Sequence, residues 1–301
     1  MESPLVSIIV PTFNRVDFIG EAIDSVFAQD YSNWELIIVD DGSTDDTKSQ
    51  LSDYLKDPRV RYFYQENQGQ SVARNKALEH ANGELICFLD SDNRWLSHKL
   101  TSSIKVLEQN SDADILYADI NSINEQGEVI EKSTMEHYSG RIAELLLKDN
   151  FVTMNTSMVK KHCFDEMGGF FKGRKAGDDY ELWLKLAVKY TFIYLPDVVA
   201  DYRIMDDQIS SDKTRRFKSN EETILSVCND YGHMMNKSKM KHGISFFYVR
   251  RGRWYSSEGK YLLMWKDFLI ALKYDPFWQG PYRLLIRGLF QYLRPTTNKI
   301  S

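Results

Sequence analysis

Short apolar runs rich in β-branched residues alternate with amphipathic stretches along the first third of the chain. Four of these runs have the length and composition of strands buried on both faces of a parallel sheet, at 6–10, 35–40, 60–65 and 84–89. The stretches between them predict helices over 18–29, 44–55 with Thr44 as N-cap, and 70–83. This alternation predicts an α/β fold with a mostly parallel, Rossmann-like sheet.

Polar residues follow three of the predicted strands at the point where each strand ends. In an open parallel sheet, ligands bind outside the carboxyl ends of the strands, where the strand order reverses. The residues that leave these ends are Pro11, Thr12, Phe13, Asn14, Asp40, Asp41, Asp90, Ser91 and Asp92. The sequence therefore predicts a single site at which acids from separate strands come together.

Asp90 and Asp92 stand one residue apart directly after an apolar run. Two carboxylates at close range repel each other unless a cation lies beside them, although such a pair taken alone is more typical of a turn. The chain contains neither G-x-G-x-x-G nor G-x-x-x-x-G-K-[ST], which argues against a glycine cradle for phosphate. The alternative is a Mg²⁺ or Mn²⁺ ion that is held by these acids and binds a diphosphate.

Arg74 adds a cation to the same edge. It lies in the stretch "NQGQSVARNKAL", within the first turns of a predicted helix. A guanidinium near a helix N-terminus is typical of an anion site. The other interpretation is an arginine on a solvated helix face.

These stretches together resemble the family-2 glycosyltransferases, which have the A-type glycosyltransferase fold. The resemblance covers 6–211 and rests on "VSIIVPTFNR", "SVFAQDYSNWELIIVDDGSTD", "NQGQSVARNKAL", "ELICFLDSDNRW" and "GDDYELWLKLA". It implies inverting transfer of a sugar from a nucleotide-diphospho-sugar, by family habit a UDP-sugar, to a hydroxyl acceptor. The acceptor would be a glycan, a lipid-linked sugar or a protein, in the synthesis of a cell-surface polysaccharide or another glycan.

The resemblance also implies roles for individual residues. Asp40 would accept a hydrogen bond from the pyrimidine ring. Asp90 would face the ribose and sugar, and Asp92 would bind the metal with help from Asp90. The donor site would further include Pro11, Thr12, Phe13, Arg15, Asp41, Arg74 and Ser91. The chain departs from the family pattern at Asn93, where a further acid is common, and at Met205, where a histidine is common. Asp206, Asp207 or a water molecule is therefore a candidate substitute for that metal contact.

The stretch "GDDYELWLKLA" carries the expected general base, which inverting transfer needs in order to remove the acceptor proton. Asp178 and Glu181 resemble a capping box, which would leave Asp179 on the first helical turn. The family's base is the second acid of this pair. We therefore expect Asp179 as base and Asp178 as its structural neighbour, with Arg203 as a supporting cation. The alternative is that both acids only stabilise the helix N-terminus.

The sequence leaves two roles open for a polar run at 155–157 and for two tryptophan residues. Asn155, Thr156 and Ser157 are expected either to meet the acceptor or sugar or to belong to a polar β segment. Trp95 and Trp183 are expected either as sugar-stacking platforms or as core residues, and aromatic residues are more often core.

The C-terminal part of the chain has a helical pattern and the opposite charge. Residues 213–301 contain 17 Lys and Arg against 6 Asp and Glu, while the whole chain has a formal net charge of -5. Two helices joined at Glu258–Gly259 and ended by Pro276 resemble one tetratricopeptide-type hairpin. An amphipathic helix over 281–295, with arginines interleaved among aromatic residues, indicates either a membrane-surface contact or a docking helix.

Composition adds three expectations about compartment and partners. Three widely spaced cysteines among 301 residues favour a reducing compartment. The sequence shows neither a signal peptide nor a window near the length of a membrane span, so we expect a protein that is either cytoplasmic or peripheral at the inner face of the membrane. The acidic first part makes nucleic acid an improbable partner.

The division expected from these patterns is a catalytic domain over 1–212 and a helical region over 213–301. Within the catalytic domain, 1–95 would bind the nucleotide and 96–212 the acceptor. One rival hypothesis is a non-catalytic nucleotide-sugar-binding subunit of a glycan-assembly complex. Another is a nucleotidyltransferase, which would usually have a glycine- and lysine-rich loop where this chain has "PTFNR".

Overall fold

The computed structural model describes residues 3–132, 137–171, 177–205 and 212–293. These residues form two compact units, one from Met1–Ile142 with Phe151–Ser219 and one from Ala143–Asn150 with Asn220–Ser301. The domain division expected from the sequence stays a prediction. No helix within the described ranges has the length and apolarity required to cross a bilayer.

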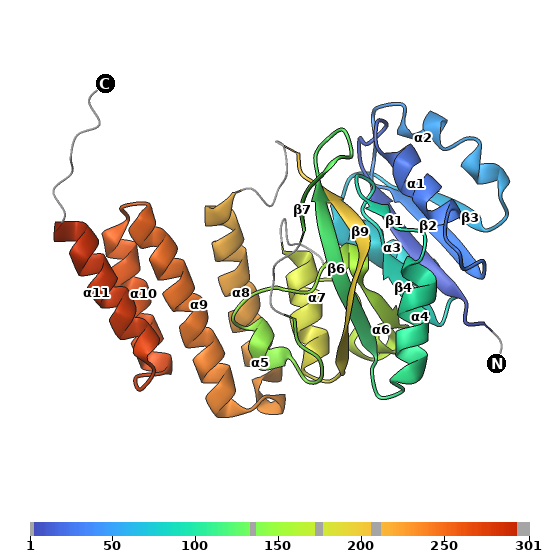
Figure 1. Ribbon diagram of the computed structural model, residues 1–301. Coiled ribbons are helices and arrows are strands. Elements are labelled where there is room, and N and C mark those ends of the chain that lie inside the picture. Colours follow the sequence, from blue (N-terminus) through green and yellow to red (C-terminus); the bar gives the residue numbers. More distant parts are fainter. Residues whose placement is uncertain (1–2, 133–136, 172–176, 206–211, 294–301) are drawn as a thin grey trace, which may run out of the picture. The chain divides into compact units, whose positions relative to one another are not determined.

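The first unit is built on a sheet with strand order β3-β2-β1-β4-β8-β6-β9-β5, and β7 pairs with β6 (Figure 1). Pairing is parallel among β3, β2, β1 and β4 and again between β6 and β9, while β8, β7 and β5 pair antiparallel. The expected α/β fold with a mostly parallel sheet is therefore confirmed. The strands are β1 Val6–Thr12, β2 Trp34–Asp40, β3 Val60–Tyr64, β4 Leu85–Phe88, β5 Arg94–Trp95, β6 Ile115–Ile123, β7 Val129–Lys132, β8 Met158–Lys160 and β9 Phe192–Arg203.

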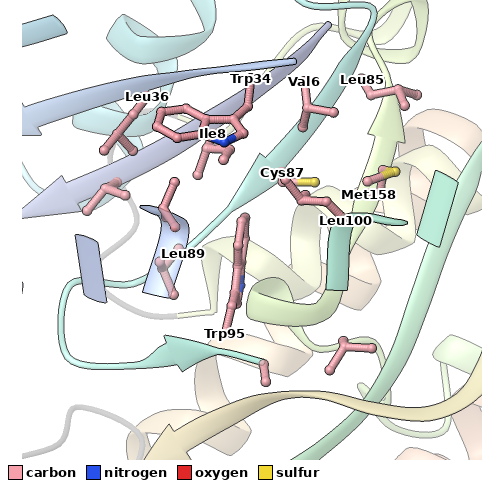
Figure 2. Packing of buried hydrophobic residues seen from close by; sticks show 14 of the residues in the cluster. Val6, Ile8, Trp34, Leu36, Leu85, Cys87, Leu89, Trp95, Leu100 and Met158 are labelled. Atoms are coloured by element: carbon pink, nitrogen blue, oxygen red, sulfur yellow. The ribbon is translucent and has the colours of Figure 1, made fainter. Parts of the chain in front are cut away.

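The helices of the first unit cover both faces of this sheet. Alternate residues of β1, beginning with Val6 and Ile8, pack in a core with α1 and α4, and Figure 2 shows part of that core. On the opposite face α3 contacts β1 and β2, and Phe164 of α6 packs edge-on against Phe88 of β4. The helices of this unit are α1 Ile19–Phe27, α2 Thr47–Gln50, α3 Gln70–His80, α4 Lys99–Gln109, α6 His162–Met167 and α7 Asp178–Ala187.

The second unit consists of helices from two parts of the chain. Its elements are α5 Ala143–Leu146, the greater part of α8 Lys213–Tyr231, α9 Lys237–Ser257, α10 Tyr261–Tyr274 and α11 Gln279–Leu293. Asn236 caps α9 by accepting a hydrogen bond from the Lys239 amide, and Gly259 with a φ of 69° turns the chain between α9 and α10. The predicted hairpin joined at 258–259 is thus confirmed.

One helix start differs from the prediction. The helix expected from Thr44 begins only at Thr47, with Asp46 as N-cap, and ends at Gln50. The amide and hydroxyl of Thr44 instead donate to the side chain of Asn14, in the loop after β1. The prediction was wrong because a contact with another strand loop outweighs the local preference of Thr44 for a cap.

Candidate active site

The carboxyl ends of β1, β2 and β4 meet at one edge, as the sequence predicted. The Asp41 amide donates to the Thr12 carbonyl at 2.8 Å, which joins the ends of β2 and β1. The loop after β1 then reaches both neighbours, because the Asn14 amide donates to the Ser43 hydroxyl and the Arg15 guanidinium lies 3.6 Å from the Asp92 carboxylate. The acids that leave β2 and β4 therefore border one site.

Asp40 is the last residue of β2 at this edge, and it is almost fully buried. One carboxylate oxygen accepts the Ser43 amide and the other accepts the Tyr62 hydroxyl, both at 2.8 Å. The buried hydroxyl of Thr12 has no hydrogen-bond partner among the described residues, and the side chain of Phe13 is 43% exposed. Buried acceptors beside an exposed ring can hold a planar, polar ligand.

Asp41 has a different environment from Asp40. One of its oxygens accepts the Gln68 amide at 2.9 Å and the Gln65 side chain at 2.7 Å, and the other accepts the Gly69 amide at 2.7 Å. These bonds fix the loop that leads into α3. Gly42 follows with a φ of 88°, and a Cβ there would lie 2.8 Å from the Asn67 amide nitrogen, so the loop requires glycine.

Arg74 of α3 is buried between two carboxylates and does not lie on a solvated face. Its Nη1 donates to Asp178 at 2.7 Å, its Nη2 donates to Asp90 at 2.5 Å, and the ring of Phe170 lies 5.4 Å from its guanidinium carbon. Burial alone would lower the pKa of Arg74, but Asp178 and Asp90 raise it overall. Arg74 therefore stays charged and joins the β4 edge to α7.

The predicted capping box at the start of α7 is wrong. Gly177, with a left-handed φ of 74°, takes the N-cap position, so this helix begins without a side-chain cap. Asp178 points instead to α3, where it accepts hydrogen bonds from Arg74, from the Gln70 side chain at 2.9 Å and from the Ser71 hydroxyl at 3.2 Å. The ion pair and these bonds satisfy Asp178 better than the local cap would.

Asp179 occupies the first turn of α7 beside this network. Burial raises the pKa of its carboxyl group to about 6, and the neighbouring negative charge of Asp178 adds to the effect. A carboxylate with such a pKa is largely ionised at neutral pH and is more basic than an exposed aspartate. This combination is typical of a general base.

Asp90 and Asp92 differ in how many of their oxygens the protein already binds. Asp90 accepts hydrogen bonds from Arg74 and from the Asn155 amide group at 3.0 Å, and its own amide donates back to Asn155 at 2.7 Å. Asp92 lies 3.6 Å from the Arg15 guanidinium, and burial together with the charge of Asp90 raises its pKa to about 6. Between them, the side chain of Ser91 is buried.

Asn155 is a site residue whose partner the sequence did not reveal. The polar run from Asn155 to Ser157 was a signal, but it allowed several interpretations. In the structure all three side chains are buried around a short 3₁₀ turn, and the Asn155 carbonyl also accepts the indole N–H of Trp95. Trp95 and Trp183 are buried as well, which agrees with the core interpretation.

Arg203 supports the backbone of the loop that contains Asp90 and Asp92. Its Nε donates to the Asp92 carbonyl at 3.0 Å, and its amide donates to the Asn93 side chain at 2.8 Å. It also forms an ion pair with Glu21. Asn93 is thus a structural link to β9. Met205, two residues on, is buried, and Asp206 and Asp207 lie outside the described residues.

The carboxylates of this site fit a divalent cation only if a bound phosphate ligand supplies further oxygen atoms. Within the described ranges, no group of three or more Asp, Glu, His or Cys side chains could hold a metal ion. Burial and, next, the charge of Asp90 raise the pKa of Asp92, so this carboxylate would gain from a bound cation. Mg²⁺ and related ions are commonly held by one or two carboxylates together with substrate phosphates, so the site fits an ion that arrives with a phosphate ligand.

Comparison with known proteins gives the following similarities. Residues 7–176 match the family model described as glycosyl transferase family 2. The putative teichuronic acid biosynthesis glycosyltransferase TuaG of Bacillus subtilis is 34% identical over 218 residues, which cover 71% of this chain and 85% of TuaG. An uncharacterized glycosyltransferase of Rickettsia felis is 36% identical over 184 residues, which cover 61% of this chain but only 30% of that protein.

Solved structures show the same fold at low identity. The crystal structure of Staphylococcus aureus TarS 1–349 in complex with UDP-GlcNAc superposes with a TM-score of 0.71 and 18% identity, covering 95% of this chain and 89% of that one. The mannosyltransferase PcManGT from Pyrobaculum calidifontis, in complex with GDP-Man and Mn²⁺, gives a TM-score of 0.60 and 19% identity, covering 97% and 88%.

Proposed function

The chain belongs to glycosyl transferase family 2, and on this premise we propose that it transfers a sugar from a UDP-sugar to a hydroxyl acceptor with inversion at the anomeric carbon. One observation carries the proposal. Buried Arg74 joins Asp90 at the strand edge to Asp178 at the start of α7, so the predicted donor residues and the predicted base, Asp179, border one site.

The donor would bind along the edge formed by β1, β2 and β4. Phe13 offers an exposed ring for the base, Asp40 accepts a hydrogen bond from the pyrimidine N–H, and the Thr12 hydroxyl gains a partner. The position of Asp41 between Gln65, Gln68 and Gly69 favours an indirect role, in which it holds the loop before α3. The UDP-GlcNAc complex of TarS supports a uridine nucleotide.

A divalent ion would enter with the donor diphosphate and bind Asp92. When bound, it would neutralise the charge that develops on the departing nucleoside diphosphate. Asp90 is less suited to contact the ion directly, since Arg74 and Asn155 already bind its oxygens. The Mn²⁺ complex of PcManGT supports a divalent metal ion in this role.

The chemical step would be a single displacement. The acceptor oxygen forms a bond to the anomeric carbon while the bond from that carbon to the diphosphate oxygen breaks, and Asp179 takes the acceptor proton. The first turn of α7 and the pKa of about 6 keep Asp179 ionised yet basic at neutral pH. Arg74 positions Asp178 beside it and is not itself required as a proton donor.

The biological setting proposed here is the synthesis of a cell-surface polysaccharide, which the name of TuaG supports. Its acceptor would be a growing glycan, free or lipid-linked. The chain spans about 30% of the length of the Rickettsia relative, so the activity is proposed for this chain alone and not for that longer protein.

The proposal is tested with a set of UDP-, dTDP- and GDP-sugars, each with and without Mn²⁺. We expect thermal stabilisation by UDP-sugars that depends on Mn²⁺, and release of UDP by the wild type. Asp179→Asn should keep donor binding and lose about 10²–10⁴ of the turnover rate. Asp165→Asn, an exposed acid in the first turn of α6, is the matched control.

The result that would overturn the proposal is donor binding without any hydrolysis or transfer in the wild type. That outcome would favour the non-catalytic nucleotide-sugar-binding subunit. The stereochemistry is read by NMR of the product, and retention at the anomeric carbon would exclude the single displacement.

A further inference from the structure

Helices α10 and α11 of the second unit leave large apolar side chains in solvent. Both helices pack against α9 and against each other, which buries one side of each. On the outer side the exposed fraction is 88% for Leu262, 62% for Leu269, 96% for Phe277 in the connecting turn and 54% for Ile286. Tyr282 and Leu289 of α11 are also exposed. Scattered single apolar residues are normal on a surface, but this density on two adjacent helices is not.

The spacing of these residues forms stripes that also contain cations. On α10, Leu262, Lys266, Leu269 and Lys273 follow each other at intervals of three and four residues, so they lie on one helical face. On α11, Tyr282, Ile286 and Leu289 repeat this spacing, and Arg283 and Arg287 flank them. All four of these cations are exposed.

The acids of the same stretch are turned toward α9, and Asp267, together with Glu221 of α8, interacts electrostatically with Lys266. The sequence from 260 to 293 holds only two acids, and both bind basic groups of α9. Asp267 is buried and accepts two hydrogen bonds from Arg251, at 2.8 and 2.9 Å, and Asp275 accepts one from His242 at 2.8 Å. The outer surface of α10 and α11 therefore combines apolar and basic side chains, with acidic groups turned inward.

We propose that this surface, formed by the outer side chains of α10, the 275–278 turn and α11, docks on a lipid bilayer that contains anionic lipids. Apolar side chains enter the headgroup boundary, while Lys and Arg extend their charged ends to phosphates. Each basic residue near such a bilayer adds to affinity, and salt weakens the effect. Docking of a second copy through the same surface is disfavoured, because it would bring cations against cations. The inference goes beyond the proposed transfer reaction and does not depend on it.

The test measures co-sedimentation of the full chain with vesicles of phosphatidylcholine alone and with vesicles that also contain phosphatidylglycerol. We expect binding only to the anionic vesicles, weakened by salt. The triple variant K273Q/R283Q/R287Q should bind at least about tenfold more weakly. The variant L269S/F277S/I286S, which removes apolar contacts and leaves the charge unchanged, should also lose binding.

Two control variants test whether vesicle binding is specific to this surface. K237Q/K239Q/K241Q removes the same number of exposed cations from the start of α9, and V129S/I130S removes exposed apolar residues from β7. Both should bind within about twofold of the wild type. Circular dichroism and thermal unfolding confirm that each variant is folded.

Three results would overturn the proposal: no binding to anionic vesicles, equal binding to neutral ones, or an equal loss in the α9 control. Concentration-dependent self-association without vesicle binding would instead assign the surface to a second copy. None of these readouts requires turnover, so failure of the docking proposal and failure of the transferase proposal are distinguishable.

Discussion

The Nη1 atom of Arg74 lies 2.7 Å from the Oδ2 atom of Asp178, although the two residues are 104 positions apart in the sequence. Both side chains are less than 5% exposed. The pair connects α3, which follows the donor edge of the sheet, with the first turn of α7, which carries Asp179. The same guanidinium reaches Asp90. One buried cation therefore sets the position of two parts of the site.

Replacing Arg74 by methionine should destabilise the protein strongly. Removal of one partner from a buried ion pair leaves an uncompensated charge, and we expect the free energy of unfolding to fall by about 3–5 kcal/mol at pH 7. Lys56→Met, in the exposed pair with Asp53, should leave it almost unchanged, because solvent screens this pair. Chemical denaturation of both variants measures the difference. Equal effects would mean that the burial of Arg74 has no energetic consequence.

The rate of sugar transfer should depend on the protonation of Asp179. Its pKa of about 6 predicts that turnover at saturating donor falls as the pH decreases through about 6 and is level above about 7. A pH–rate profile of the wild type and of Asp165→Asn should show the same inflection. An unchanged rate down to pH 5 would exclude Asp179 as the base.

Asp92→Asn should stabilise the protein at neutral pH in the absence of metal and donor. The pKa of Asp92 is raised from 3.8 to about 6 by burial and by Asp90, so the folded state binds more protons than the unfolded state between these values. Stability is therefore lost as the pH rises through this window, by on the order of 1–3 kcal/mol at pH 7. Thermal unfolding should show a higher midpoint for the variant at pH 7 and almost no difference near pH 3.5.

The same variant separates stability from function. Mn²⁺ with a UDP-sugar should raise the unfolding midpoint of the wild type and leave that of Asp92→Asn almost unchanged, because the variant lacks the carboxylate that would bind the ion. A lower midpoint for the variant at pH 7 without ligands would contradict the raised pKa of Asp92.

Asp41→Ala should loosen the loop before α3. The carboxylate accepts hydrogen bonds from the amides of Gln68 and Gly69, and its loss should cost about 1–3 kcal/mol and lower donor affinity indirectly. Hydrogen exchange should report faster exchange at these two amides. Asp46→Ala, at a cap position without a side-chain bond, is the control and should have a smaller effect. Slow exchange at both amides in Asp41→Ala would assign Asp41 to the donor alone.

Much of the donor edge could be predicted from local sequence. Each strand end that carries Thr12, Asp40 or Asp90 is marked by an apolar run followed by polar residues, and parallel strands place such ends together. The capping prediction for Asp178 was wrong for a related reason. A local rule weighs only neighbours along the chain, whereas Asp178 binds groups of α3 that lie about a hundred residues away.

The sequence by itself therefore determined the order of the elements, the edge at which the acids gather and the stretch that carries Asp179, because periodicity and turn chemistry act within short windows. The tertiary structure decided which partner each charged group has. It buried Arg74 between two acids, paired Asn155 with Asp90 and used Asp41 to hold a loop. The physical reason is that charge pairing in a folded chain depends on how helices pack against the sheet, and this packing joins residues that are distant in sequence.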